Sequence, residues 1–263
     1  MKQSINPARP SCLKVQILGI SYARSGNFFH LYLEPTPWES RPGQFVMLRP
    51  QGWDNDPIWP RPFSICEKND DSLRIFIQIV GRGTGLISRL QPGSTLHIWG
   101  PLGNGFQFSP DMPLLILAGG MGIAPFVGLC KSHPNPELIR FIFGHRMDIG
   151  CYPFAELPPA SSRIHLQQTG QADIFDFQRL LRQEIEDCPA GSRILACGPT
   201  PFLKVVQEYA RESVKDAWMS LENKMACGVG ACLGCVTMTS SGDYVQTCSH
   251  GPVFRAEDVV FEE

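Results

Sequence analysis

The stretch Glu222–Phe254 reads ENKMACGVGACLGCVTMTSSGDYVQTCSHGPVF and contains four of the chain's ten cysteines. These are Cys227, Cys232, Cys235 and Cys248, separated by four, two and twelve residues. A set of soft thiolates selects zinc or an iron–sulfur cluster. Structural zinc usually takes two short Cys pairs, whereas Cys-x4-Cys-x2-Cys followed by a distant fourth Cys is the plant-type [2Fe–2S] spacing. The stretch therefore predicts a [2Fe–2S] site, with zinc or unliganded thiols as the alternatives.

The glycines between these cysteines have a physical purpose in such a loop. A loop that wraps a cluster must take positive φ angles and bring backbone N–H groups close to sulfur, and Gly228, Gly230 and Gly234 allow both. The other cysteines are scattered, and we expect most of them to be small buried hydrophobic residues.

Composition limits the class of protein. A chain of 263 residues that is 43% hydrophobic is near the length at which chains divide into domains, so two or three are expected. A net charge of −2 gives no electrostatic footprint for nucleic acid or an anionic membrane. We find neither a signal peptide nor an apolar stretch of about 18 residues, which favours a soluble, cytoplasmic protein.

The pattern of predicted secondary structure changes twice along the chain. Residues 1–108 contain short β-type runs between Gly and Pro, which predicts an antiparallel β-barrel. Residues 109–217 alternate strand and helix patterns, which predicts an α/β domain with a parallel sheet. Residues 218–263 form a small Cys- and Gly-rich lobe. The predicted fold class is thus a multidomain α+β protein.

Two segments place glycines at the ends of predicted strands. LLILAGGMGIAPF brings Gly119, Gly120 and Gly122 to a strand-to-helix turn, where backbone donors and the helix dipole favour a phosphate. ILACGPTPFLKVV repeats the layout with Cys197. Both strand ends border the crevice where open α/β sheets bind ligands. A tight turn without a ligand is the alternative for the first segment, and simple packing is the alternative for Cys197.

A second phosphate cradle is predicted in the barrel. PRPFSICE holds Arg61 and Ser64 beside a predicted strand, and IVGRGTGLISRL offers Gly83 and Thr84 ahead of a short helix. A guanidinium, a hydroxyl and a glycine cradle are what a flavin nucleotide needs. A strand entered after a rigid turn is the alternative interpretation.

Together, RPFS, GRGTGLIS, GPLGNGF, LAGGMGIAP, CGPTPF and LENKMACGVGACLGCV resemble, in chain order, the ferredoxin-reductase superfamily. Within it the chain is most similar to the electron-transfer subunits of NAD-linked dihydroorotate dehydrogenases. This resemblance implies a barrel that binds FAD, an α/β domain that receives a nicotinamide coenzyme, and a C-terminal [2Fe–2S] lobe. It also implies an FMN-containing catalytic partner, which oxidises dihydroorotate to orotate in pyrimidine biosynthesis, in a heterotetramer with two copies of each subunit.

The resemblance also implies roles for individual residues. Cys197 would lie near the hydride-transfer region as the catalytic candidate, and Gly119, Gly120 and Gly122 would face the coenzyme. The implied FAD-binding residues are Arg61, Pro62, Phe63, Ser64, Phe76, Ile77, Gln78, Gly83 and Thr84.

One departure from the family concerns the coenzyme. Where the family usually has an acidic stretch rich in Gly and Ser, this chain has TGQADIFDFQ, residues 169–178, with a single glycine. The choice between NAD and NADP is therefore open, and Arg146 could meet a 2′-phosphate.

The mechanism implied by the resemblance is electron relay. A nicotinamide takes a hydride and an iron–sulfur cluster takes single electrons, so a flavin must stand between them. Three modules fill the chain and leave no substrate domain, which also argues for a partner. One alternative is a similar subunit of an NADH-dependent ferredoxin:NADP⁺ oxidoreductase or a sulfide dehydrogenase. A zinc-stabilised binding module without a redox role is another.

Overall fold

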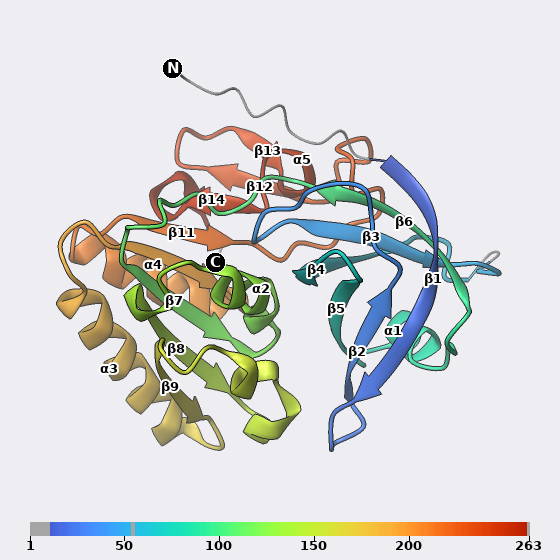
Figure 1. The fold of residues 1–263 in the computed structure, drawn as a ribbon. Helices are drawn as coiled ribbons and strands as arrows, with labels where there is room; N and C mark the ends of the chain where they lie inside the picture. The colour runs from blue at the N-terminus through green and yellow to red at the C-terminus, as the bar shows by residue number, and fades with distance from the viewer. Residues whose placement is uncertain (1–10, 54–55, 262–263) are drawn as a thin grey trace.

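The computed structural model describes residues 11–53 and 56–261, which begin with a closed six-stranded antiparallel barrel (Figure 1). Its strands follow each other in the order β1-β2-β5-β4-β3-β6, which confirms the predicted barrel. They are β1 Ser11–Tyr22, β2 Phe28–Leu33, β3 Phe45–Pro50, β4 Arg61–Lys68, β5 Leu73–Gln78 and β6 Thr95–Leu102, with the short helix α1 Arg82–Ile87 between the last two.

The barrel forms because its strands carry apolar side chains at inward positions. Along β1, the buried Val15 and Ile17 alternate with exposed residues, as the two-residue period of a strand requires. Leu31, Leu48 and Ile98 from other strands are fully buried in the same core.

The second unit is a six-stranded sheet in the order β14-β11-β10-β7-β8-β9. All neighbouring pairs from β11 to β9 are parallel, which confirms the predicted α/β domain. Its strands are β7 Leu114–Gly119, β8 Ile139–His145, β9 Ser162–Gln167, β10 Arg193–Cys197 and β11 Ala217–Ser220. The helices are α2 Ala124–Ser132, α3 Gln171–Asp187 and α4 Thr200–Glu212, with 3₁₀ turns at Gly120–Ile123, Pro136–Leu138, Ile149–Cys151 and Pro153–Glu156.

The C-terminal segment forms a small three-stranded sheet of β12 Val236–Thr239, β13 Tyr244–Gln246 and β15 Val259–Val260. Helix α5 Thr247–His250 and a 3₁₀ turn at Ala256–Asp258 complete it. Strand β14 Val253–Arg255 of the same segment is not part of this sheet and pairs antiparallel with β11. The lobe is thus joined to the nucleotide unit by backbone hydrogen bonds as well as by the chain. The domain boundaries at residues 108 and 217 stay a prediction.

The barrel and the sheet share a hydrophobic core. Phe28, Phe76 and Phe106 of the barrel unit pack in one cluster with α2 and β7 residues such as Phe126 and Ile116. Helix α2 runs close to β4, because a Cβ added to Gly128 of α2 would lie 2.9 Å from the Cys66 carbonyl oxygen. The two units therefore form a continuous interior.

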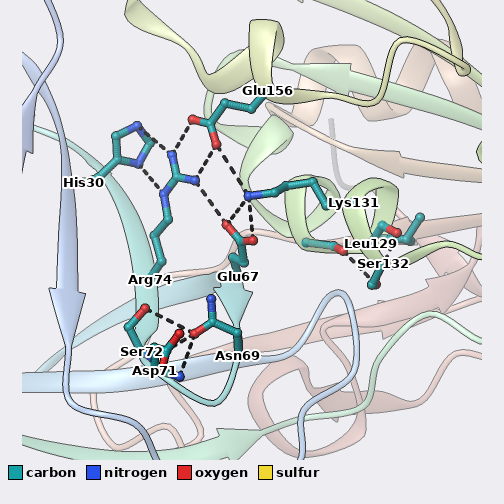
Figure 2. Close-up of polar contacts among 11 residues, drawn as sticks. His30, Glu67, Asn69, Asp71, Ser72, Arg74, Leu129, Lys131, Ser132 and Glu156 are labelled. Carbon is teal, nitrogen blue, oxygen red and sulfur yellow. Dashed lines mark hydrogen bonds and ion pairs between the residues drawn. The ribbon is translucent and has the colours of Figure 1, made fainter.

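A buried ion cluster closes one side of this interface (Figure 2). The guanidinium of Arg74 on β5, with a side chain 6% exposed, donates to both carboxylate oxygens of Glu156 at 2.6 Å. It also lies 3.2 Å from Glu67 on β4, which accepts from Lys131 of α2 at 2.6 Å. Carboxylates from both units thus contact the buried guanidinium of Arg74, and Lys131 adds a second cation to the cluster. His30 completes the cluster and accepts a hydrogen bond from Arg74 Nε at 3.1 Å.

Burial and the neighbouring Arg74 lower the pKa of His30 to about 4. The ring is therefore neutral near pH 7 and can accept this hydrogen bond. It also stacks on Phe76, with ring centroids 4.7 Å apart. His30 thus joins the ion cluster to the shared hydrophobic core.

Helices of the kind that cross a bilayer are absent from the part of the chain that the structure describes, since none combines the required length with the required apolarity.

Arg74→Met is expected to lower the free energy of unfolding by about 2–3 kcal/mol, because it leaves the Glu156 carboxylate without its closest partner and Glu67 with Lys131 alone. Urea denaturation followed by circular dichroism measures this. Arg179→Met, which removes an exposed pair with Asp176, serves as the control and should cost less than about 0.5 kcal/mol. Equal losses in the two variants would show that the buried cluster contributes nothing beyond a surface pair.

Candidate functional site

The cysteine loop between β11 and β12 turns its backbone donors toward sulfur. Cys227 Sγ accepts from Val229 N and from Cys232 N, each at 3.4 Å. Cys248 Sγ accepts from Gly230 N at 3.1 Å, and Cys232 Sγ from Gly234 N at 3.5 Å. Positive φ angles at Gly228, Gly230 and Leu233 produce this curvature. These donors are what thiolate ligands of an iron–sulfur cluster need around them.

The thiols of the four cysteines differ in their surroundings. Burial alone would raise the pKa of Cys227, but the backbone N–H groups of Val229 and Cys232 outweigh it and lower the pKa to about 7. Burial and the adjacent Cys235 raise the pKa of Cys248 to about 12. All ten cysteines are free. Within residues 11–53 and 56–261, no group of three or more His, Cys, Asp or Glu side chains is arranged to hold a metal ion. The thiols and the N–H groups around them are of the chemical type that a cluster needs, and ligation by the four cysteines stays a prediction.

The loop lies directly on the barrel. Buried Cys235 and Cys248 pack with Phe45, Met47 and Leu102 of strands β3 and β6. Trp99 Nε1 of β6 donates to the Cys227 carbonyl oxygen at 3.3 Å. A Cβ added to Gly228 would lie 2.8 Å from Met47 Sδ, so only glycine permits this approach. The cysteine loop is thereby held against the unit in which we predict the flavin.

The predicted flavin residues come together where β4 begins. The Arg61 side chain lies across Gly83, since a Cβ added there would be 2.7 Å from Arg61 Nε. Arg61 Nη1 also donates to the Trp59 carbonyl oxygen at 3.0 Å. The hydroxyl of Thr84 accepts from Val80 N at 2.9 Å and so shapes the turn before α1. The structure therefore joins Arg61 to the glycine cradle, although the Thr84 hydroxyl is already used within the turn.

The other predicted flavin residues are either half-buried on β4, buried in the hydrophobic cores or exposed to a cavity. Pro62, Phe63 and Ser64 are half-buried along β4 and pair with Met47, Val46 and Phe45 of β3. Phe76 and Ile77 are 2% and 1% exposed and belong to the hydrophobic cores, so their side chains are packed in the interior. Gln78, by contrast, faces a cavity.

That cavity, of about 560 Å³, lies at the carboxyl ends of the parallel strands. Strands β8 and β9 extend from β7 to one side, and β10 and β11 extend to the other, so the site coincides with the switch in strand order where such sheets bind ligands. Predicted residues Gly119 and Gly120 line it. Gly120 has φ +54°, which lets the chain turn sharply out of β7.

Two residues predicted beside the coenzyme lie behind the cavity wall. A Cβ on Gly122 would clash with the backbone of Cys197, so this glycine allows two strand-end turns to touch. The Cys197 side chain is 1% exposed, and burial followed by the charge of Glu222 raises its pKa. A neutral buried thiol suits packing, and its surroundings do not support a catalytic role.

Sequence reasoning missed several residues of these sites. Glu222 lines the cavity, and desolvation by the surrounding protein raises its pKa although solvent reaches the side chain. The neighbouring Asn223 donates to the Cys235 carbonyl oxygen at 3.2 Å and to Thr247 Oγ1 at 2.8 Å, which ties the cysteine loop together. No sequence signal marks either residue, because both act through tertiary contacts.

Comparison with known proteins identifies the family of the chain. Residues 222–260 match the family model described as the iron-sulfur cluster binding domain of dihydroorotate dehydrogenase B. The electron transfer subunit of dihydroorotate dehydrogenase B (NAD⁺) from Caldanaerobacter subterraneus subsp. tengcongensis is 35% identical over 224 residues, covering 84% of this chain and 87% of that protein. The corresponding subunit from Clostridium perfringens is also 35% identical, covering 83% and 87%.

Solved structures share the fold. A structure of an NADH-dependent reduced ferredoxin-NADP oxidoreductase superposes with a TM-score of 0.79 at 24% identity, covering 94% of this chain and 89% of that one. Phthalate dioxygenase reductase superposes with a TM-score of 0.64 at 15% identity, covering 90% and 94%.

The resemblance inferred from the sequence motifs is thus confirmed over most of the chain. With a matching cluster-binding segment and relatives above 30% identity across more than four-fifths of its length, this chain belongs to the family of electron transfer subunits of dihydroorotate dehydrogenase B (NAD⁺).

Proposed function

We propose that this chain is the electron transfer subunit of an NAD⁺-linked dihydroorotate dehydrogenase and that it works with an FMN-containing catalytic subunit. Electrons from dihydroorotate reach NAD⁺ through a [2Fe–2S] cluster and FAD. The observation that carries the proposal is the contact between the cysteine loop and barrel strands β3 and β6, which brings the cluster segment against the flavin-binding unit. FAD supplies the exchange between single electrons and a hydride, which neither a nicotinamide nor a cluster can perform alone.

The chain's own residues bind and orient these groups. Cys227, Cys232, Cys235 and Cys248 hold the cluster, and the loop's N–H groups stabilise negative charge on sulfur. Arg61, lying over Gly83, provides a charge-assisted donor for the flavin phosphates.

The cavity beyond Gln78 receives the coenzyme, and Gly119 and Gly120 form the turn at its wall. The part of the chain that the structure describes is accounted for by the barrel, the nucleotide sheet and the lobe, which leaves the oxidation of dihydroorotate to the partner.

The partner is expected to contact the exposed apolar surface of the lobe. Val229, Leu233, Val236 and Tyr244 are 55%, 58%, 41% and 62% exposed, although apolar side chains are costly to leave in water as one patch. Met225 of the same loop is partly buried and packs against the contact with the barrel, so it is not part of this surface. We further propose a heterotetramer with two copies of each subunit, and a cytoplasmic location, with which free thiols throughout are compatible.

Cys232→Ala is expected to abolish the electron paramagnetic resonance signal of the reduced cluster, because it removes one of the four proposed thiolate ligands. The matched control is Cys12→Ala, which removes another exposed cysteine outside the loop and should keep the signal. A full signal in the Cys232 variant would rule this residue out as a ligand.

Arg61→Ala is expected to weaken FAD binding roughly ten- to a hundredfold, since a hydrogen bond from a charged group contributes about 1.5–3 kcal/mol. Fluorescence titration of the flavin-free protein measures the affinity. Arg89→Ala removes an exposed arginine just beyond α1 and should leave it unchanged. If both variants bind FAD like the parent, Arg61 serves only the turn at Trp59.

The isolated chain is expected to pass electrons from NADH to artificial acceptors but not to oxidise dihydroorotate. Addition of the FMN-containing subunit should restore dihydroorotate-dependent NAD⁺ reduction. Leu233→Asp should weaken this assembly at least tenfold by placing a charge in the apolar contact, with the flavin and cluster spectra retained.

Leu18→Asp is the control for this substitution, because Leu18 is 51% exposed on barrel strand β1, outside the lobe. Sedimentation velocity measures the assembly. Dihydroorotate oxidation by the chain alone would overturn the division of labour, and normal assembly of the Leu233 variant would exclude this surface.

A further inference from the structure

One face of barrel strand β5 forms a contact with the sheet unit. Side chains on a strand alternate between its two faces, so Arg74, Phe76 and Gln78 lie on the same face. Ile75 and Ile77, on the opposite face, belong to the core of the barrel, whereas Phe76 belongs to the core shared with the sheet. On the contact face, Arg74 binds carboxylates, Phe76 packs in the shared core, and Gln78 lines the cavity at the strand ends.

This face meets the connection between β8 and β9. Glu156, near the end of that connection, accepts from both terminal nitrogens of Arg74 at 2.6 Å (Figure 2). Tyr152, four residues earlier, packs its ring against Phe28 of β2 with centroids 5.1 Å apart, and its centroid lies 6.4 Å from that of Phe76. The connection is therefore attached to the barrel at two points, one charged and one aromatic.

The aromatic point of attachment is also part of the cavity. Tyr152 is 8% exposed and lines the cavity, while its ring packs on Phe28 of the barrel. Gln78 lines the same cavity from β5. One part of the cavity wall is thus built from a barrel strand and from a connection of the sheet, and the pair of Arg74 and Glu156 joins these two parts.

The sheet holds this connection by its backbone. Arg163 of β9 donates to the carbonyl oxygens of Phe154 and Leu157 at 3.1 and 2.6 Å. The side chain of Glu156, which lies between those two residues in sequence, binds the barrel instead. Lys131 of α2, at 3.9 Å, is its more distant cation. The pair with Arg74 is therefore the closest charged contact between the connection and the barrel.

We propose that Glu156 is a positioning residue: through its pair with Arg74 it sets the position of Tyr152, and so the spacing between the barrel and the cavity that we propose for the coenzyme. Glu156 does not line the cavity, so it acts through Tyr152. Transfer of a hydride depends steeply on such spacing, because a displacement of about 1 Å can lower a rate about a hundredfold. The inference rests on the proposed function for the role of the cavity and extends it to a residue outside the cavity.

Hydrogen–deuterium exchange of the FAD-loaded chain tests the positioning without any reaction. Glu156→Gln keeps the size of the side chain and removes its charge, and the amides of residues 146–157 should exchange about fivefold faster in this variant. Glu184→Gln is the matched control, because Glu184 also binds one arginine, Arg140, with both carboxylate oxygens but does not line the cavity. It should leave these amides unchanged. Unchanged exchange in the Glu156 variant would overturn the inference.

Anaerobic mixing with NADH, followed by flavin absorbance, gives the second measurement. At saturating NADH, Glu156→Gln should lower the rate of flavin reduction about tenfold, with the Kd for NADH within about twofold of the parent. Tyr152→Leu should lower the rate by a similar factor. The double variant should lose little more than either single one, because both changes act through the position of one ring.

The outcomes separate this inference from the proposed function. A parent-like rate in Glu156→Gln, or losses that multiply fully in the double variant, would contradict the positioning role alone. A parent chain whose bound FAD is not reduced by NADH would contradict the proposed function, and the exchange measurement would then decide on the positioning by itself.

Discussion

A guanidinium buried in a protein must be surrounded by carboxylates, because an unpaired charge in the interior costs several kcal/mol. In this chain those carboxylates come from different units: Glu67 from the barrel and Glu156 from the turn after β8, with Arg74 between them (Figure 2). Satisfying Arg74 therefore requires the barrel and the nucleotide sheet to sit in one relative position. Electron transfer between a flavin and a nicotinamide needs the same fixed position, because the reacting groups must be in contact. The ion pairs that Arg74 requires therefore also hold the barrel and the sheet in the fixed position that electron transfer needs.

The cysteine loop is held in place by close packing against the barrel. Gly228 lets the loop approach Met47, and Trp99 then holds the Cys227 carbonyl from the barrel side. Strand β14 meanwhile leaves the lobe and joins the sheet next to β11. The lobe is consequently attached to both larger units. Leu233 of the lobe remains exposed and belongs to the surface that we propose for the partner.

The sequence could predict features that depend on local patterns, but not features that depend on contacts between distant residues. Local patterns encode the cysteine spacing, the barrel and the alternating strands and helices. All three were predicted from the sequence. Arg74 lies in the mainly apolar strand LRIFIQ, and the sequence does not identify the carboxylates that surround it. The burial of Cys197 and the exposure of Glu222 depend on which strand ends meet in three dimensions. Gly122 was read as a ligand-binding glycine, whereas its contact with the Cys197 backbone gives it a packing purpose.

The cavity that we propose for the coenzyme has a charge asymmetry that a local pattern could not reveal. Glu222 lies at the end nearest the cysteine loop, and Arg146 lies where the cavity opens toward α3. An oxidised nicotinamide carries positive charge, and the adenosine half carries the anionic phosphates, so opposite charges at the two ends favour one orientation of the dinucleotide. Desolvation raises the pKa of Glu222, and a cation beside the carboxylate would act in the opposite direction. A cationic ring beside Glu222 would therefore stabilise the carboxylate, and the carboxylate in turn would favour the oxidised coenzyme over the reduced one at the end of the cavity nearest the electron-transfer units.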